Sequence, residues 1–229
     1  MTKLPARPTV VFLLSGPVNY GAPMMAEVAP FAAVTLHQVG KTGFVLTELS
    51  VDHLRAELAA RGVAPPYIFA AHSFAGFTAI AYTHRYPGEV AGLALLDSTH
   101  PRQTPTALRS LPAAGEPTTP AIEEFRRFIQ GWGPVYGESC AFVGRITSLG
   151  AVPLMVLVAG KPDMPAGIGE PLRSELTRGF HQVQREHARL SSDSEFQIIP
   201  GVGHDLFGQA PREVKSAILR LVEKSGRAP

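Results

Sequence analysis

Residues 65–87 read PPYIFAAHSFAGFTAIAYTHRYP, and this stretch decides the fold. The run 66–71 is apolar and suits a buried strand, whereas the residues after Ser73 have the small and apolar character of a buried helix. Between them lies AHSFAG, residues 71–76. A strand that passes directly into a helix leaves little room at the turn, so very small residues on both sides of Ser73 indicate a tight strand-to-helix turn with a serine at its tip.

This turn resembles the nucleophile elbow of the α/β-hydrolase superfamily, in particular its esterase-like and lipase-like members that use a serine. The motif usually has glycines two positions before and two positions after the serine, and here Ala71 and Ala75 stand in their place. Alanine is the smallest residue with a Cβ, and Gly76 still permits close helix packing. The resemblance implies that Ser73 is a nucleophile. The alternative is a serine that only caps a helix.

The rest of the chain alternates short runs rich in Val, Ile and Leu with segments of helical length. This is the pattern of a doubly wound, mostly parallel α/β sheet covered on both faces. We expect buried strands at residues 9–15, 32–37, 66–71, 91–97, 153–159 and 195–199. Helices are expected at 50–61, behind Ser50 as a cap, and from Pro211 to a stop at Gly226. With 229 residues, the sequence predicts a single domain over 1–229, the same α/β class that the resemblance implies.

Residues 101–152 interrupt this alternation. They open with a Pro/Thr-rich segment and continue with a helical pattern, so we predict a small helical lid inserted between two strands. Ligand sites are mostly apolar. We therefore expect a substrate pocket walled by Pro17, Asn19, Met24, Met25, Phe74, Phe125, Phe128 and Trp132. The alternative is that these side chains only pack the lid onto the core.

A serine hydroxyl is a poor nucleophile at neutral pH unless a base removes its proton, and histidine is the usual base. Among eight histidines, His204 follows the last expected strand in IIPGVGHDLFGQAPREV, residues 198–214, the place where the resemblance puts the catalytic histidine. His72 adjoins Ser73 in sequence and is geometrically poor as its base. The other six are interpreted as surface, helix or pocket residues: His37, His53, His84, His100, His181 and His187.

Two aspartates compete for the third role, which is to accept a hydrogen bond from the imidazole and fix its tautomer. Asp163 follows a strand in GKPDMP, the usual family position, and Asp97 ends another strand in LLDSTHP, where some relatives place the acid. We favour Asp163 and keep Asp97 as the alternative. Either one could instead be a turn residue that bonds its own backbone.

Acyl transfer also needs N–H donors for the oxygen that becomes negative. The backbone N–H of Phe74 is expected to be the first donor of this oxyanion hole. The second normally comes from the loop after the first strand, but Pro17 has no N–H, so Val18 or the Asn19 side chain is expected to replace it. The segment 19–43 also leaves little room for a helix, which predicts a pocket open on that side.

The composition excludes several classes of function. A net charge of +2 without a Lys/Arg run argues against a nucleic-acid partner, and no segment approaches the roughly 20 apolar residues of a membrane span. The apolar run after Arg7 is too short for a signal peptide, and Cys140 is the single cysteine, so we expect a cytoplasmic protein. Metal-ligand spacings and phosphate-binding glycine loops are absent from the sequence, so no metal or cofactor is expected.

Three functions remain open at this point. The first is a serine hydrolase that acts on a small to medium, largely apolar ester, lactone or related acyl compound through an acyl-Ser73 intermediate. The second is a lyase or cyclase on a biosynthetic intermediate, in which Ser73 and His204 move protons. The third is a binding protein without catalysis on the same fold. The oligomeric state is not predicted.

Overall fold

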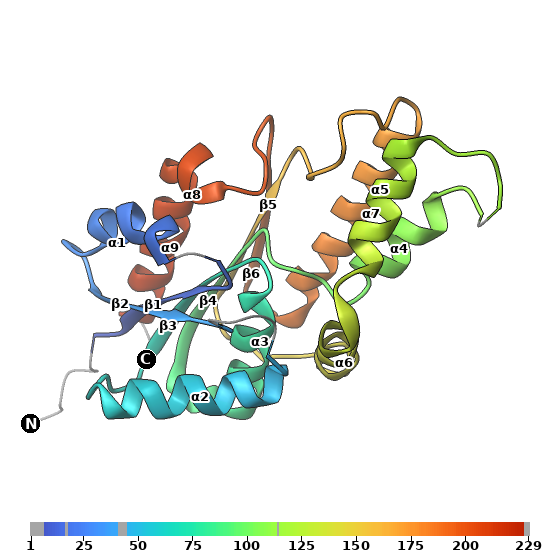
Figure 1. Ribbon diagram of the computed structural model, residues 1–229. Helices are drawn as coiled ribbons and strands as arrows, with labels where there is room; N and C mark the ends of the chain where they lie inside the picture. The colour runs from blue at the N-terminus through green and yellow to red at the C-terminus, as the bar shows by residue number, and fades with distance from the viewer. Residues whose placement is uncertain (1–6, 17, 41–44, 114, 227–229) are drawn as a thin grey trace, which may run out of the picture.

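The computed structural model describes residues 7–16, 18–40, 45–113 and 115–226, and its centre is one sheet of six parallel strands. The strand order is β2-β1-β3-β4-β5-β6 (Figure 1). All six strands lie within about one residue of the predicted runs, so the doubly wound α/β class is confirmed. Their bounds are β1 Thr9–Leu14, β2 Ala33–Gln38, β3 Tyr67–His72, β4 Val90–Leu96, β5 Leu154–Ala159 and β6 Ser194–Ile199.

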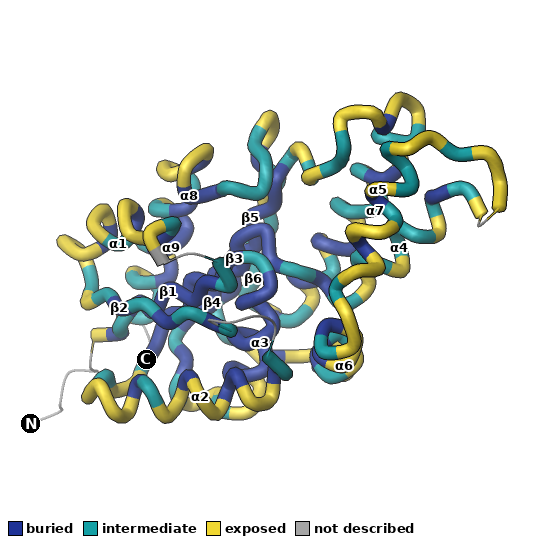
Figure 2. The backbone as a smooth tube through the Cα atoms, viewed as in Figure 1, coloured by how far each residue is buried: buried dark blue, intermediate teal, exposed yellow. Residues whose placement is uncertain are grey.

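Burial separates the central strands from the edge strands. The strands β3 and β5 are buried at every residue, as the apolar runs predict (Figure 2). The edge strands β2 and β6 are only partly buried, so the expectation that every strand is covered on both faces is wrong for these two. Each edge strand has a neighbour on one side only, and this exposure fits its more polar sequence.

Helices cover both faces of the sheet because alternate side chains of each strand point to opposite faces. Val11 and Leu13 pack in one cluster with α2 (Thr47–Ala60) and α3 (Ala75–Arg85). Val10 and Phe12 pack in a second cluster with α1 and α9 on the other face. The bounds there are α1 Ala22–Val28, α8 Leu206–Gln209 and α9 Pro211–Ser225.

Two details of the helices differ from the predictions. A helix of seven residues, α1, does fit before β2, and it begins with Pro23 in its first turn. The predicted cap Ser50 lies buried inside α2, which begins three residues earlier at Thr47. The last helix agrees with the sequence, because Pro211 is its first residue and Gly226 follows its end.

The described part of the segment between β4 and β5 forms three helices, of which the first two lie away from the sheet and the third packs against α2 and α3 (Figure 1). A small separate core joins this segment to α7, through Phe125, Ile129 and Leu176 among others. The function of residues 101–152 as a lid stays a prediction. The bounds are α4 Gln103–Ser110, α5 Pro120–Gln130, α6 Gly133–Val143 and α7 Leu172–Glu186, with 3-10 turns at Val18–Tyr20, Pro87–Glu89 and His187–Leu190.

Candidate active site

Ser73 lies at the tip of the sharp turn between β3 and α3. Its φ is 58°, in the left-handed region that residues with a Cβ rarely adopt. Backbone hydrogen bonds hold this conformation: the N–H of Ser73 donates to the carbonyl of Leu96 at 3.2 Å, and its carbonyl accepts from Gly76 and Thr99, both at 3.1 Å. A strained serine held from several sides is typical of a functional position.

Gly76 is the position where the turn tolerates no side chain. A Cβ on Gly76 would lie 2.5 Å from the Cβ of Ser98, which follows β4. Ala71 and Ala75 are fully buried, and the hydroxyl of Ser98 donates to the carbonyl of Ala71 at 2.9 Å. The crowding inferred from the sequence is therefore present, and it is most severe at Gly76.

Asp97 forms the closest polar contact of the site. Its Oδ2 lies 2.6 Å from Nδ1 of His204, and its Oδ1 accepts the N–H of Ala159 at 2.8 Å. The N–H of Asp97 donates to the carbonyl of Leu157 at 2.7 Å. The Asp97 side chain is 5% exposed and that of His204 is 38% exposed, so a fixed, buried carboxylate supports an imidazole that reaches solvent. Nδ1 of His204 carries the proton of this hydrogen bond, which leaves Nε2 as the basic atom.

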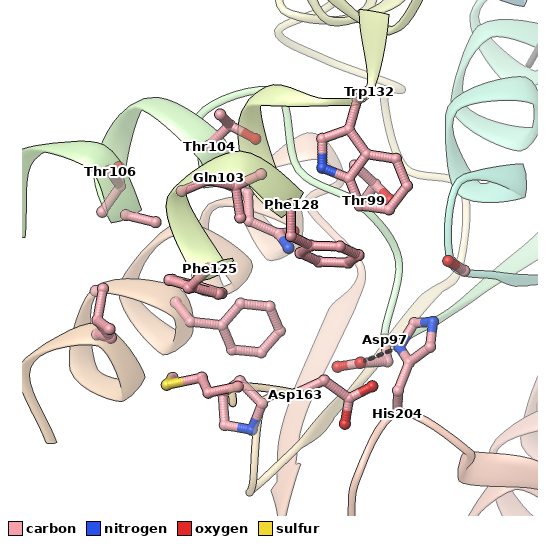
Figure 3. Close-up of a pocket in the computed structure, with 18 of the residues that line it drawn as sticks. Asp97, Thr99, Gln103, Thr104, Thr106, Phe125, Phe128, Trp132, Asp163 and His204 are labelled. Atoms are coloured by element: carbon pink, nitrogen blue, oxygen red, sulfur yellow. Dashed lines mark hydrogen bonds and ion pairs between the residues drawn. The ribbon is translucent and has the colours of Figure 1, made fainter. Parts of the chain in front are cut away.

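The preference for Asp163 as the partner of the imidazole is corrected by this contact. Asp97 directly follows β4, the strand next to β3, so it lies beside the turn that carries Ser73. Asp163 lies three residues beyond Gly160 in the exposed loop after β5, and its side chain reaches the cavity (Figure 3). Asp97, the alternative acid, is therefore the hydrogen-bond partner of His204.

The environment of His204 raises the pKa of its imidazole above the ordinary 6.5. Burial by itself lowers this pKa. The hydrogen bond with Asp97 and the negative charges of Asp97, Asp163 and Asp205 outweigh the effect of burial. A more basic imidazole accepts a proton more readily, which suits a general base.

His72 supports the loop that carries His204, a role that the sequence did not reveal. Its Nε2 donates to the backbone carbonyl of His204 at 2.8 Å, and the two rings lie 4.4 Å apart. Tyr20 and Phe207 pack against the same ring at 5.1 Å and 5.6 Å. Burial and the neighbouring His204 lower the pKa of His72 to about 4, so it is neutral near pH 7.

A cavity of about 300 Å³ opens beside Ser73, Asp97 and His204. Its apolar wall comes mainly from α5, α6 and α7, and Figure 3 shows Phe125, Phe128 and Trp132 at the cavity. Its polar wall is the face of α4 at positions 103, 104, 106 and 110, a helical spacing that the sequence reasoning missed. The apolar lining is Phe74, Ala107, Phe125, Phe128, Ile129, Trp132, Tyr136, Pro162, Met164, Leu176, Gly179 and Phe180.

Several residues expected at the pocket lie elsewhere. Met24 is 2% exposed and packs in the core under α1, and Met25 packs against the same cluster, because α1 turns both toward the sheet. Asn19 is exposed and does not line the cavity. Pro17 lies outside the described residues. Ser15, which directly follows β1, lines the cavity.

Comparison with known proteins shows which solved structures share this architecture. No protein-family model matches the sequence, and no curated protein sequence matches it. Solved structures do match. A thermophilic esterase from Thermogutta terrifontis is 20% identical with a TM-score of 0.58, over 96% of this chain and 90% of that one. The putative non-heme bromoperoxidase BpoC of Mycobacterium tuberculosis is 16% identical with a TM-score of 0.61, over 97% and 94%.

A third structure, an α/β-hydrolase enzyme from lagoon sediments of Mar Chica in Morocco, is 12% identical with a TM-score of 0.60, over 94% and 91%. At such identities the likeness defines the fold alone. The chain has the α/β-hydrolase fold, and the resemblance noted at the Ser73 turn is confirmed at that level. In the part of the chain that the structure describes, no helix combines the length and the apolar character needed to span a membrane.

Proposed function

We propose that this protein is a serine hydrolase that cleaves small to medium, largely apolar carboxylic esters, lactones or related acyl compounds. One observation carries the proposal: the Asp97–His204 pair and the strained Ser73 line the same cavity. Two of the three similar structures support it, because one is an esterase and another is an α/β-hydrolase enzyme. A serine, a base and a carboxylate that fixes the base are the parts that acyl transfer requires.

In the first half of the reaction, Nε2 of His204 takes the proton of the Ser73 hydroxyl while Oγ forms a bond to the carbonyl carbon. The electron pair of the C=O bond moves to oxygen. The tetrahedral intermediate then collapses, the bond to the leaving group breaks, and the imidazolium gives its proton to the departing oxygen. This leaves an acyl-Ser73 ester, and Asp97 stabilises the imidazolium while it exists.

In the second half, water replaces the leaving group. His204 removes a proton from the water as its oxygen bonds to the acyl carbon, and collapse of the second intermediate returns that proton to Ser73 Oγ and releases the carboxylic acid. Hydrogen bonds between catalytic groups are often long in the free enzyme and tighten in the complex. The Ser73–His204 bond is expected to form in this way.

The negative oxygen of both intermediates needs donors. The N–H of Phe74 stands at the N-terminus of α3, where the helix dipole favours negative charge. For the second donor we propose the hydroxyl of Ser15, which lines the cavity, and keep the N–H of Val18 as the alternative. A side-chain hydroxyl can donate to the negative oxygen, so it can replace the backbone N–H that Pro17 lacks.

Hydrolysis of 4-nitrophenyl butyrate in H₂¹⁸O tests this function. We expect one ¹⁸O atom in the butyrate, and loss of turnover in Ser73→Ala. Release of 4-nitrophenol that persists in Ser73→Ala would contradict the acyl-Ser73 mechanism. Absence of turnover on all short and medium esters, with ligand binding retained, would indicate a binding protein.

A further inference from the structure

The cavity beside Ser73 has an unbalanced charge. Its acidic and basic lining residues are Asp97, Asp163 and His204, and among the described residues no lysine or arginine lines it. Such a wall repels anionic substrates, because a buried or half-buried anion without a cationic partner is costly. Carboxylates, phosphates and other anions near the reacting carbonyl are therefore disfavoured.

The two aspartates differ in the hydrogen-bond partners of their carboxylates. Asp97 is 5% exposed in its side chain and is engaged by His204 and by the N–H of Ala159. Asp163 is exposed, and within the described residues its carboxylate has no hydrogen bond or ion pair. Figure 3 shows Asp163 on the same side of the cavity as the Asp97–His204 pair. Asp163 thus offers the site a negative charge, and among the described lining residues His204 is the one basic group that faces it.

The opposite side of the cavity is aromatic. Phe128 and Trp132 meet edge to face at 4.9 Å, and Trp132 stacks with Tyr136 at 5.7 Å (Figure 3). The face of an aromatic ring attracts a cation within about 6 Å of its centre, and tryptophan does so most strongly. Aromatic rings combined with a free carboxylate favour an ammonium group whose surface is largely apolar.

From this arrangement we infer that the preferred substrates carry a positive charge close to the reacting carbonyl, as an ammonium or quaternary ammonium group, and that Asp163 sets this preference. The inference rests on the proposed hydrolase function and names its substrate class. A quaternary ammonium keeps the apolar surface that the aromatic wall requires. It also adds the charge that separates it from neutral substrates of the same shape.

A pair of isosteric esters tests the kinetic side. The 4-nitrophenyl esters of 4-(trimethylammonio)butanoate and 5,5-dimethylhexanoate differ by N⁺ against C, and acetylcholine and 3,3-dimethylbutyl acetate form the matching pair on the alcohol side. We expect kcat/KM to favour the cation at least tenfold in one pair. In Asp163→Asn this ratio falls toward one, whereas Glu124→Gln, which removes an exposed α5 carboxylate away from the cavity, keeps it. The inference is overturned if the ratio is near one in the wild type, or if Asp163→Asn slows both esters equally.

Binding gives a readout that does not depend on turnover. Trp132 is the single tryptophan of the chain and lines the cavity, so its fluorescence reports occupancy directly. In Ser73→Ala, we expect phenyltrimethylammonium to change this fluorescence at a concentration at least tenfold lower than benzoate does, and Asp163→Asn to reduce the difference. Equal responses to both ligands would refute the charge preference. If the cation changes the fluorescence but the protein hydrolyses no ester, the cation-binding site is supported and the hydrolase function is refuted.

Discussion

Nδ1 of His204 lies 2.6 Å from Oδ2 of Asp97, although 107 positions separate the two residues in the chain. The sheet brings them together, because Asp97 directly follows β4 and His204 follows β6, both at the carboxyl edge where Ser73 follows β3. In open α/β sheets this edge is where ligands bind.

Asp97→Asn should lower kcat/KM for a neutral ester by roughly 10³- to 10⁴-fold, because the introduced amide cannot hold the imidazole in the right tautomer. The backbone should tolerate the change, since Asp97 has a φ of 44° and asparagine adopts this region readily. Asp163→Asn should cause a far smaller loss. Steady-state kinetics of both variants decide the matter, and a greater loss in Asp163→Asn would reassign the orienting acid.

The pH profile should reflect the raised pKa of His204. The base must be neutral, so kcat/KM should fall as the pH drops through that pKa, with a midpoint above 6.5. Asp163→Asn removes one of the charges that raise the pKa, so its midpoint should move to lower pH. Glu124→Gln serves as the control. A wild-type midpoint at or below 6.5 would contradict the electrostatic description of this site.

Gly76→Ala should destabilise the fold by roughly 1–3 kcal/mol, because the new methyl group would meet Ser98 at 2.5 Å. The matched control is Gly137→Ala in α6, where a Cβ meets nothing within 4 Å. This second change should be neutral or stabilising by about 0.5–1 kcal/mol. Urea denaturation of the two variants measures both effects. Equal free energies of unfolding for Gly76→Ala and the wild type would show that the turn can accommodate a methyl group.

Acid should destabilise the protein through its buried histidines. Burial, as the largest cause, lowers the pKa of His72 and His100 to about 4 and that of His187 to about 3. The unfolded chain takes up protons near pH 6.5 where the folded one does not. The stabilising contribution is therefore complete above pH 6.5 and is lost as the pH falls toward 4. His204 has the opposite sign, since its raised pKa adds stability below pH 6.5 that is lost as the pH rises.

Each histidine that stays neutral should reduce the free energy of unfolding by about 1 kcal/mol per pH unit below 6.5. Urea denaturation at pH 7, 6 and 5 checks this slope. His187→Gln should make it shallower, whereas His53→Gln, at an exposed position of α2, should leave it as in the wild type. A stability that is flat between pH 7 and pH 5 would disprove the account of these buried rings.

The core of this fold was predictable because buried parallel strands are apolar at nearly every residue. Even the position of Ser73 at a turn follows from the alanines around it. The choice between Asp97 and Asp163 was not predictable, because both lie in the loop after a strand and the deciding quantity is the distance to an imidazole far away in the chain, 107 positions from Asp97. The burial of Met24 in the core was not predictable either, because it depends on the short helix α1. This helix has only seven residues and no acidic residue in its first turn, so the sequence signals it weakly.

The polar wall of α4 was missed because its Pro/Thr-rich sequence suggested an irregular segment. Once that segment is helical, Gln103, Thr106 and Ser110 share one face, which lines the cavity. The spacing was present in the sequence, but the apolar periodicity that reveals a helix was weak there.

Covalent labelling of Ser73 tests the central claim most directly. The wild-type protein is treated with a fluorophosphonate and digested, and the modified peptide is identified by mass spectrometry. The account predicts modification at Ser73, abolished in Ser73→Ala and slowed by several orders of magnitude in His204→Ala. An unlabelled Ser73 in the folded wild type, or equal labelling rates with and without His204, would contradict it.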